Sequence, residues 1–208
     1  LNVTSIIYSE NEAAFLAGYS AALATKSGRV AMVTTPSNAD DYENGFLLGV
    51  NAAKKNVRSF VKYTATESVV SAKALISLGI DVIYDATTGS ADGLFEAIVK
   101  ANTSKNRKKN APEVNLIIVE PDLYLSVTPA TSKYLIASVV KRVDIAVSAI
   151  IGQAVNNSQL SDVIDAKAGI YGHRYGISDK GIEIVIKSKP LAAQSAAINA
   201  AASAAYAN

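Results

Sequence analysis

The sequence contains no cysteine and no tryptophan, and only one histidine and one methionine among its 208 residues. Without cysteine, the chain can form neither a disulfide framework nor a thiolate metal site. His173 has no second histidine with which to bind zinc, and it lies among strand-like residues, so we expect a half-exposed strand histidine. We therefore expect no metal ion and no cofactor.

Charged residues are also scarce, at 18% of the chain, and the 20 Lys and Arg nearly balance the 18 Asp and Glu. Nucleic-acid binding requires an excess of positive charge, so no nucleic-acid partner is expected. The basic cluster at 105–109 lies among Asn, Ser and Pro and is typical of a solvated loop. No run of about 18 or more apolar residues occurs, so the sequence predicts no membrane-spanning helix.

The sequence does contain a repeated alternation of strand-like and helical segments. Segments rich in Val and Ile are followed by segments with helical spacing of apolar residues, and the pair recurs at least four times. This alternation predicts the α/β fold class: a three-layer, doubly wound lobe with a mostly parallel sheet and helices on both faces. We expect the lobe to span residues 1–190. The expected strands are 2–8, 29–35, 57–65, 80–86, 114–120, 169–177 and 180–186.

Two further helices are expected in the second half of the chain. Residues 133–155 are predicted to form one long helix, because large apolar residues from Leu135 onward recur at spacings of four and three. This helix would carry two adjacent cations, Lys141 and Arg142. An alanine-rich helix is expected at 191–208, where 10 of the last 17 residues are alanine, the best helix former. Because it has few large apolar side chains, we expect it to pack by close alanine contact or on a neighbouring chain.

Three loops are candidates for a binding site. In an open α/β sheet, ligands bind beyond the carboxyl ends of the strands. The loops at 34–41, 86–93 and 120–124 follow predicted central strands. In the second of them, Gly89 belongs to a glycine-rich turn whose backbone N–H groups, at a helix start, could bind an anion or polar ligand atoms. A plain β–α turn is an equal alternative.

The other candidate contacts are an aromatic ring and two carboxylates. Phe95 could present its ring to a base, although its place in a helix favours the core. Glu120 and Asp122 could accept hydrogen bonds from sugar hydroxyls. Acid/base catalysis by these carboxylates and a solvated turn opened by Pro121 are the alternatives. No catalytic motif of the G-x-S-x-G or H-E-x-x-H type occurs, so we do not expect an enzyme.

Four blocks of the sequence share their order and spacing with one known family. The blocks are NVTSIIYSENEAAFLAGYSAAL, DDYENGFLLGVNAA, LGIDVIYDATTGSADGLFEA and SVVKRVDIAV. From about residue 2 to residue 186, the chain resembles the basic membrane protein family of surface lipoproteins, whose best understood members are purine-nucleoside receptors of ABC importers. The resemblance implies a two-lobed periplasmic-binding-protein architecture of the sugar-binding type, which closes on a nucleoside.

The resemblance also implies roles for single residues. Lys141 is similar to the family lysine that reaches toward the ligand. Arg142 would then point to solvent or to an acidic partner. Phe95 and the turn that contains Gly89 resemble the family segment whose aromatic ring stacks on the base.

The chain departs from the family in two respects. Glu120 stands where the family has an aspartate that holds ribose hydroxyls, and Pro121 follows it, whereas Asp122 matches the second acid of that motif. Family members also carry a large segment before the point that matches Leu1, which forms most of the first lobe. Because one wall cannot enclose a small ligand, weak binding is expected. We consider a processed second lobe, a lobe that pairs with a separate first lobe, and a lobe reused as a building block.

The function that the resemblance implies is that of a lipoprotein-like solute-binding component of an ABC importer, located outside the cell. Its partners would be a nucleoside and the permease or the missing first lobe. The alternative is a structural or assembly subunit, which could form filaments by head-to-tail stacking. Asn2, Asn102 and Asn156 begin Asn-x-Ser/Thr sequons, which are possible glycosylation sites.

Overall fold

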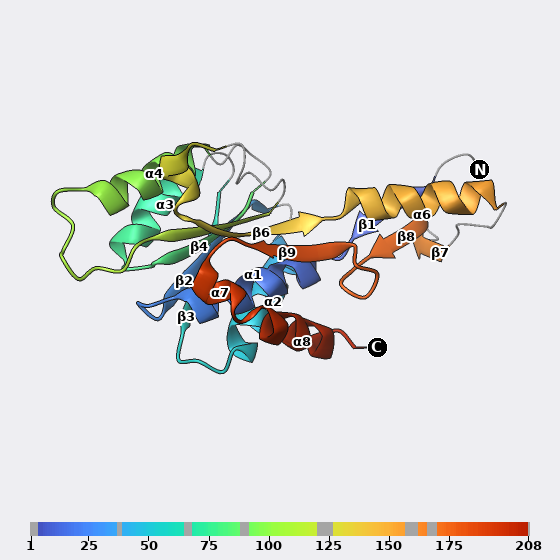
Figure 1. Cartoon of the computed structure of the whole chain (residues 1–208), viewed down its shortest axis with the longest axis horizontal. Coiled ribbons are helices and arrows are strands. Elements are labelled where there is room, and N and C mark those ends of the chain that lie inside the picture. The colour runs from blue at the N-terminus through green and yellow to red at the C-terminus, as the bar shows by residue number, and fades with distance from the viewer. Residues whose placement is uncertain are drawn as a thin grey trace.

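The molecule is elongated and has two parts, as Figure 1 shows. The computed structural model describes residues 4–36, 39–64, 68–87, 92–119, 127–156, 162–165 and 170–207. A large body is built around a six-stranded sheet, and a small body contains a three-stranded sheet and a helix that project from it. The predicted α/β class with a mostly parallel sheet is confirmed.

The sheet of the large body has the strand order β3-β2-β4-β5-β6-β9. Neighbouring strands are parallel, except that β9 is antiparallel to β6. All side chains of the central strand β4 are buried, whereas the edge strand β3 is partly exposed. The strands are β2 Arg29–Thr34, β3 Arg58–Tyr63, β4 Val82–Ala86, β5 Asn115–Val119, β6 Leu135–Lys141 and β9 Ile182–Ile186.

Side chains of this sheet alternate between two apolar layers. Val30 and Met32 face the layer of α1, α2 and the C-terminal helices, whereas Ala31 and Val33 face the layer of α3 and α4. Such alternation is expected of a sheet that helices cover on both faces. The helices of the large body are α1 Glu10–Ala24, α2 Ala39–Ala52, α3 Ser68–Ser77, α4 Asp92–Thr103, α5 Pro129–Ser132, α7 Lys189–Ala192 and α8 Ser195–Ala205. Within the described part of the chain, no helix combines the length and apolarity needed to cross a membrane.

Helices α1 and α2 approach so closely that glycine is required between them. A Cβ atom added at Gly45 would come within 2.0 Å of the backbone oxygen of Asn11, and one at Gly49 within 2.2 Å of that of Phe15. Both neighbours are backbone atoms of a buried helix, so they cannot move away cheaply. The close packing of α1 on α2 therefore depends on these two glycines.

Gly49→Ala is expected to lower the free energy of unfolding by about 1–3 kcal/mol, because it overpacks this helix contact. The matched control is Gly152→Ala in α6, where an added Cβ meets no atom within 4 Å. That change is expected to raise stability by up to about 1 kcal/mol, because alanine favours a helix. Urea unfolding of both variants provides the measurement. Equal effects of the two substitutions would contradict the close approach.

The small body comprises three strands and one helix. These are β1 Ser5–Tyr8, α6 Val143–Val155, β7 Asp162–Asp165 and β8 Ile170–Tyr175. The strand order is β1-β8-β7, with β1 parallel and β7 antiparallel to β8. Helix α6 projects from the large body in the same direction as β1 and β8 (Figure 1). The predicted first strand therefore forms, but it is half-buried and belongs to the small sheet rather than to the main one.

The prediction of one helix over 133–155 is wrong. Residues 135–141 form strand β6, which lies between β5 and β9 in the large sheet, and only 143–155 form helix α6. The side chains of 135–139 are buried, as in a strand covered on both faces. A short apolar run of this kind fits a buried strand and a helix equally well by spacing alone. Hydrogen bonding to β5 on one side and β9 on the other favours the strand over the helix for this segment.

The last two predicted strands both form, but they do not pair with each other. β8 pairs with β1 and β7 in the small sheet, whereas β9 pairs with β6 in the large sheet. The segment 176–181 between them is therefore a connection between the two bodies and not a hairpin turn.

The alanine-rich C-terminal segment packs on α1 of the same chain. Ile198 and Ala202 of α8 are fully buried in the same apolar layer as α1. The hydroxyl of Tyr206 donates a hydrogen bond of 3.1 Å to the backbone oxygen of Asn11, and its ring meets that of Phe15 edge-on at 5.6 Å. Burial raises the pKa of Tyr206 to about 12. The segment thus has a partner within the chain.

Candidate functional site

The two bodies are connected by three passages of the chain. Strand β1 leads into α1 at Ser9, β6 leads into α6 at Arg142, and β8 leads into β9 through residues 176–181. Strand β6 is parallel to β5, and through it to β4 and β2, so all four end at the same edge of the large sheet. We call this the crossover edge. It is the edge at which an open α/β sheet binds ligands.

Lys141, a predicted ligand contact, is the last residue of β6 and lies at the crossover edge. Its Nζ is 3.2 Å from Oε1 of Glu10, in the first turn of α1, and 5.8 Å from the centre of the ring of Tyr8. The side chains of Lys141 and Glu10 are 18% and 31% exposed, so the ion pair is partly shielded from water. The lysine thus contacts the first passage between the bodies.

Arg142 does not contact the same groups as its neighbour. Its Nε and one terminal nitrogen donate to both carboxylate oxygens of Asp144, at 2.8 and 2.7 Å, and the other donates to Glu183 of β9 at 3.0 Å. The acidic partner that the resemblance implies is therefore confirmed, although Arg142 precedes α6 rather than lying within a helix. Hydrogen bonds to these carboxylates raise the pKa of Arg142.

Asp144 is expected to titrate at unusually low pH. Hydrogen bonding by Arg142 lowers the pKa of Asp144 from 3.8 to about 2. Because the folded pKa is depressed, this contact stabilises the fold above about pH 4, and its contribution is lost as the pH falls through about 2. An NMR titration of the carboxyl carbon should show this midpoint, and Arg142→Gln should move it back toward 3.8. Identical midpoints in both proteins would contradict the assignment.

The third passage is held by α1. Oε2 of Glu12 accepts a hydrogen bond of 2.7 Å from the backbone N–H of Ile177. A Cβ atom at Gly176 would come within 2.7 Å of both carboxylate oxygens of Glu12, so only glycine fits there without displacing this contact. The backbone N–H of Arg142 donates to the oxygen of Gly181 at 2.7 Å. The second and third passages are thereby joined.

The crossover edge also contains a buried carboxylate, Asp85, which is not among the predicted site residues. Asp85 lies near the end of β4, is 4% exposed, and accepts hydrogen bonds from the backbone N–H and the hydroxyl of Thr87 at 3.0 and 2.7 Å. Thr34, at the end of β2 and opposite Ala86 of β4, is fully buried and donates to the backbone oxygen of Ala86 at 3.4 Å. The sequence signal that indicates such a group is a single acid inside an otherwise apolar strand.

Of the five predicted site residues, the structure describes Phe95 and Lys141. Gly89, Glu120 and Asp122 lie outside the described residues. Phe95 is 4% exposed and packs in the apolar layer of α3 and α4, which agrees with the core interpretation. Its role in stacking on a base stays a prediction, as does ligand binding by Lys141.

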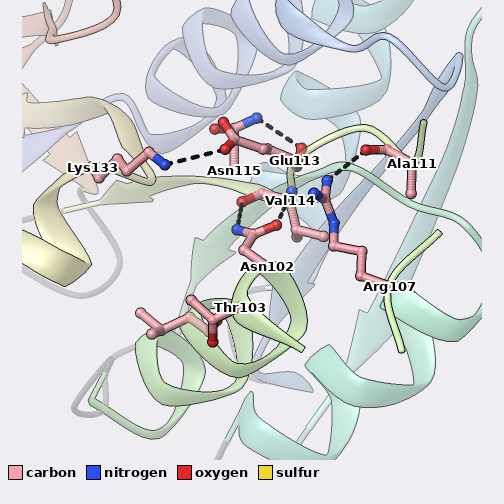
Figure 2. A network of polar contacts seen from close by, with 9 residues as sticks. Asn102, Thr103, Arg107, Ala111, Glu113, Val114, Asn115 and Lys133 are labelled. Carbon is pink, nitrogen blue, oxygen red and sulfur yellow. Dashed lines mark hydrogen bonds and ion pairs between the residues drawn. The ribbon is translucent and has the colours of Figure 1, made fainter. Parts of the chain in front are cut away.

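A hollow of about 480 Å³ lies at the opposite end of the large body, where β5 and β6 begin. Figure 2 shows the polar contacts beside it: Lys133 is 3.3 Å from Glu113, and the Asn102 amide bonds both the N–H and the oxygen of Val114 at 2.8 Å. The Asn102 contacts attach the end of α4 to Val114, the residue directly before β5. Because the hollow lies at the amino ends of the strands, we do not assign the ligand to it.

The fold, a doubly wound and mostly parallel sheet body connected by three passages to a smaller body, is similar to that of several solved structures. The fold is similar to that of an ABC transporter periplasmic solute-binding protein from Actinobacillus succinogenes with bound D-allose, with a TM-score of 0.61 and 15% identity over 91% of this chain and 63% of that chain. It is also similar to a transcriptional activator of the comK gene from Bacillus halodurans, with a TM-score of 0.68 and 16% identity over 96% and 64% of the chains.

Residues 1–202 match the family model described as Bmp, ABC transporter substrate-binding protein PnrA-like. The chain belongs to this family of ABC substrate-binding proteins. It is 29% identical to the ABC transporter nucleoside-binding protein BmpA of Lactococcus lactis, over 68% of this chain and 43% of that protein. It is 34% identical to the CD4+ T-cell-stimulating antigen of Listeria innocua, over 70% of this chain and 43% of that protein. The chain thus spans less than half the length of these relatives.

Proposed function

We propose that this chain forms the second lobe of a solute-binding protein that captures a nucleoside outside the cytoplasm, at the cell surface, and delivers it to an ABC permease. The proposal is supported chiefly by the match of residues 1–202 to the family of ABC substrate-binding proteins. The Lactococcus relative, named as nucleoside-binding, supports this ligand class. Capture requires closure around the solute and no chemical step, so no catalytic residue is proposed.

The proposed contacts follow three neighbouring strands at one edge. Gly89 comes three residues after the end of β4, Glu120 directly after β5, and Lys141 ends β6. Because β4, β5 and β6 are adjacent and parallel, chain segments that leave their ends emerge side by side. Glu120 and Asp122 would accept hydrogen bonds from ribose hydroxyls, and Lys141 would donate to the ligand. Phe95, in the first turn of α4, would stack on the base once that turn moves toward the crossover edge.

Ligand-dependent thermal unfolding tests this function. A ligand that binds only the folded state stabilises it by about 2.7 kcal/mol when its concentration is a hundred times Kd. We expect guanosine, inosine or adenosine at millimolar concentration to raise Tm, and D-arabinose and D-allose at the same concentration to leave it unchanged. No shift with any nucleoside, or an equal shift with the sugars, would reject a nucleoside as the ligand.

A further inference from the structure

The positive charge of the chain is concentrated at one edge of the large sheet. The connections that lead from a helix into the next strand meet at this edge, opposite the crossover edge, and β9 ends there because it is antiparallel to β6. These segments, 25–29, 53–58, 78–81, 104–114, 133–134 and 187–189, hold twelve of the 20 Lys and Arg of the chain but only two of its 18 Asp and Glu. We call them the basic edge. Its loop 104–114 lies at the end of the large body that points away from the small body (Figure 1).

Helix ends explain part of this charge, because cations are favoured beside the C-terminal carbonyls of helices. Lys55 and Arg29 are used in this way. They donate to the backbone oxygens of Leu23, in the last turn of α1, and of Leu78, directly after α3. Six further cations of the basic edge are exposed lysines, at positions 26, 54, 105, 108, 109 and 189. The edge therefore presents more positive charge to solvent than the helix ends require.

The two acids of the basic edge do not cancel this charge. Asp81 is 4% exposed, and its carboxylate accepts the hydrogen bonds of the loop between α1 and β2. Glu113 is exposed, but it is paired with Lys133 at 3.3 Å. Because the potentials of neighbouring charges add, the basic edge attracts anions although the whole chain is nearly neutral.

The hollow of about 480 Å³ lies within the basic edge. Its volume is in the range of small-molecule pockets, which is about 300–1,000 Å³. Leu135 and Leu191, both 2% exposed, supply apolar surface to its lining. Three lysines from separate segments line it together with serine and amide side chains; these residues are Lys26, Lys133, Lys187, Ser132, Ser188, Asn115 and Gln194. An apolar surface with a few converging polar groups is typical of a ligand site.

The backbone that carries these lysines is held in place. The N–H of Lys26 donates to the carboxylate of Asp81 at 2.7 Å. The N–H of Lys187 donates to the oxygen of Ile136 at 2.9 Å. Lys133 lies between α5 and β6 and points toward Glu113 (Figure 2). Because these segments are already ordered, binding an anion costs little conformational entropy in the backbone.

We propose that this hollow is a second binding site, which takes a small anion bearing one or more phosphate groups. A phosphate group carries nearly two negative charges at neutral pH and three acceptor oxygens, which suits three ammonium groups and the hydroxyls beside them better than a single carboxylate does. Glu113 opposes the anion and competes with it for Lys133. The site lies at the other end of the sheet from the proposed nucleoside contacts, and its test involves no nucleoside.

The probe is inorganic tripolyphosphate, titrated into the chain at low ionic strength, where charges are least screened. Binding is followed by ¹H–¹⁵N NMR. Lys133→Gln combined with Lys187→Gln removes two lysines of the hollow. The matched control, Lys105→Gln combined with Lys108→Gln, removes two exposed lysines of the same edge that do not line the hollow. Circular dichroism and Tm verify that both variants fold.

We expect saturable binding with the largest shift changes at Lys26, Asn115 and Lys187. The variant of the hollow should bind at least about tenfold more weakly, because charge-assisted hydrogen bonds are the strong ones, whereas the control should stay within about twofold of the unmodified chain. Glu113→Gln should bind more tightly, because it removes the opposing charge. Equal losses in the two double variants would assign binding to the diffuse charge of the edge and overturn the proposal, as would the absence of saturable binding.

Vesicles of phosphatidylglycerol, with phosphatidylcholine vesicles as the control, identify the source of the phosphate. Cosedimentation with the phosphatidylglycerol vesicles that the variant of the hollow loses and the control variant keeps would support the site with a lipid headgroup as its ligand. Tripolyphosphate binding without cosedimentation would support it with a dissolved phosphate compound. Cosedimentation that both double variants lose equally would count against a site in the hollow.

Discussion

Lys141→Ala is expected to weaken nucleoside binding by at least about tenfold, because a hydrogen bond from a charged donor contributes about 1.5–3 kcal/mol. The residue ends a central strand at the crossover edge, and its side chain is only 18% exposed. A partly dehydrated ammonium group interacts more strongly with a polar ligand than a fully hydrated one does. The affinity is measured by NMR titration, which detects weak as well as tight binding.

Two controls separate ligand contact from a structural role of Lys141. Glu10→Gln removes the charge of its carboxylate partner at 3.2 Å while leaving the lysine in place. We expect this variant to bind the nucleoside at least as tightly as the unmodified chain, because less attraction holds the ammonium away from the ligand. Lys73→Ala removes an exposed lysine of α3 and is expected to have no effect. Equal loss of affinity in the Glu10 and Lys141 variants would indicate that the pair only shapes the crossover edge.

Asp81→Ala is expected to destabilise the fold by about 2–4 kcal/mol, because it removes a buried carboxylate that accepts four partly buried hydrogen bonds. Asp81 is 4% exposed. Its carboxylate accepts hydrogen bonds from the backbone N–H groups of Lys26 and Ser27 at 2.7 and 2.9 Å, from the Ser27 hydroxyl at 2.8 Å, and from the Thr25 hydroxyl. These bonds attach the loop between α1 and β2 to the start of β4.

Glu113→Ala is the matched control for Asp81→Ala. It also removes a carboxylate that has a polar partner, but this carboxylate is exposed. The Glu113 and Lys133 side chains are 49% and 60% exposed, and exposed ion pairs contribute about 0–1 kcal/mol. Chemical denaturation of both variants gives the comparison. Similar losses of stability would show that the Asp81 contacts are not the main connection of the α1–β2 loop.

The fold could largely be predicted from the sequence, because each strand–helix pair carries its own local signal. Segments such as 82–86 are short, apolar and bounded by turn residues, which specifies a buried strand before any partner is known. The segment 135–141 lacked such a boundary, since Lys141 and Arg142 join it directly to the next apolar helix. Only its pairing with β5 and β9 distinguishes strand from helix, and pairing is a tertiary property.

The division into two bodies could not be predicted from local patterns. β1 and β8 are separated by more than 150 residues and meet only through the return of the chain to the small body. The contacts at the passages are similarly distant: Lys141 pairs with Glu10, and Ile177 donates to the carboxylate of Glu12. The resemblance implied that Arg142 would point to solvent or to an acidic partner, but not that the partner would be Glu183 of a neighbouring strand.

We propose that the crossover edge is where this chain binds its ligand. The most direct test is a ¹H–¹⁵N NMR titration of the chain with inosine, in which shift changes are mapped onto the structure. We expect the largest changes at the ends of β4, β5 and β6, including Thr87 and Lys141. Changes centred on Lys26, Lys133 and Lys187 around the 480 Å³ hollow at the other end of the sheet would contradict it.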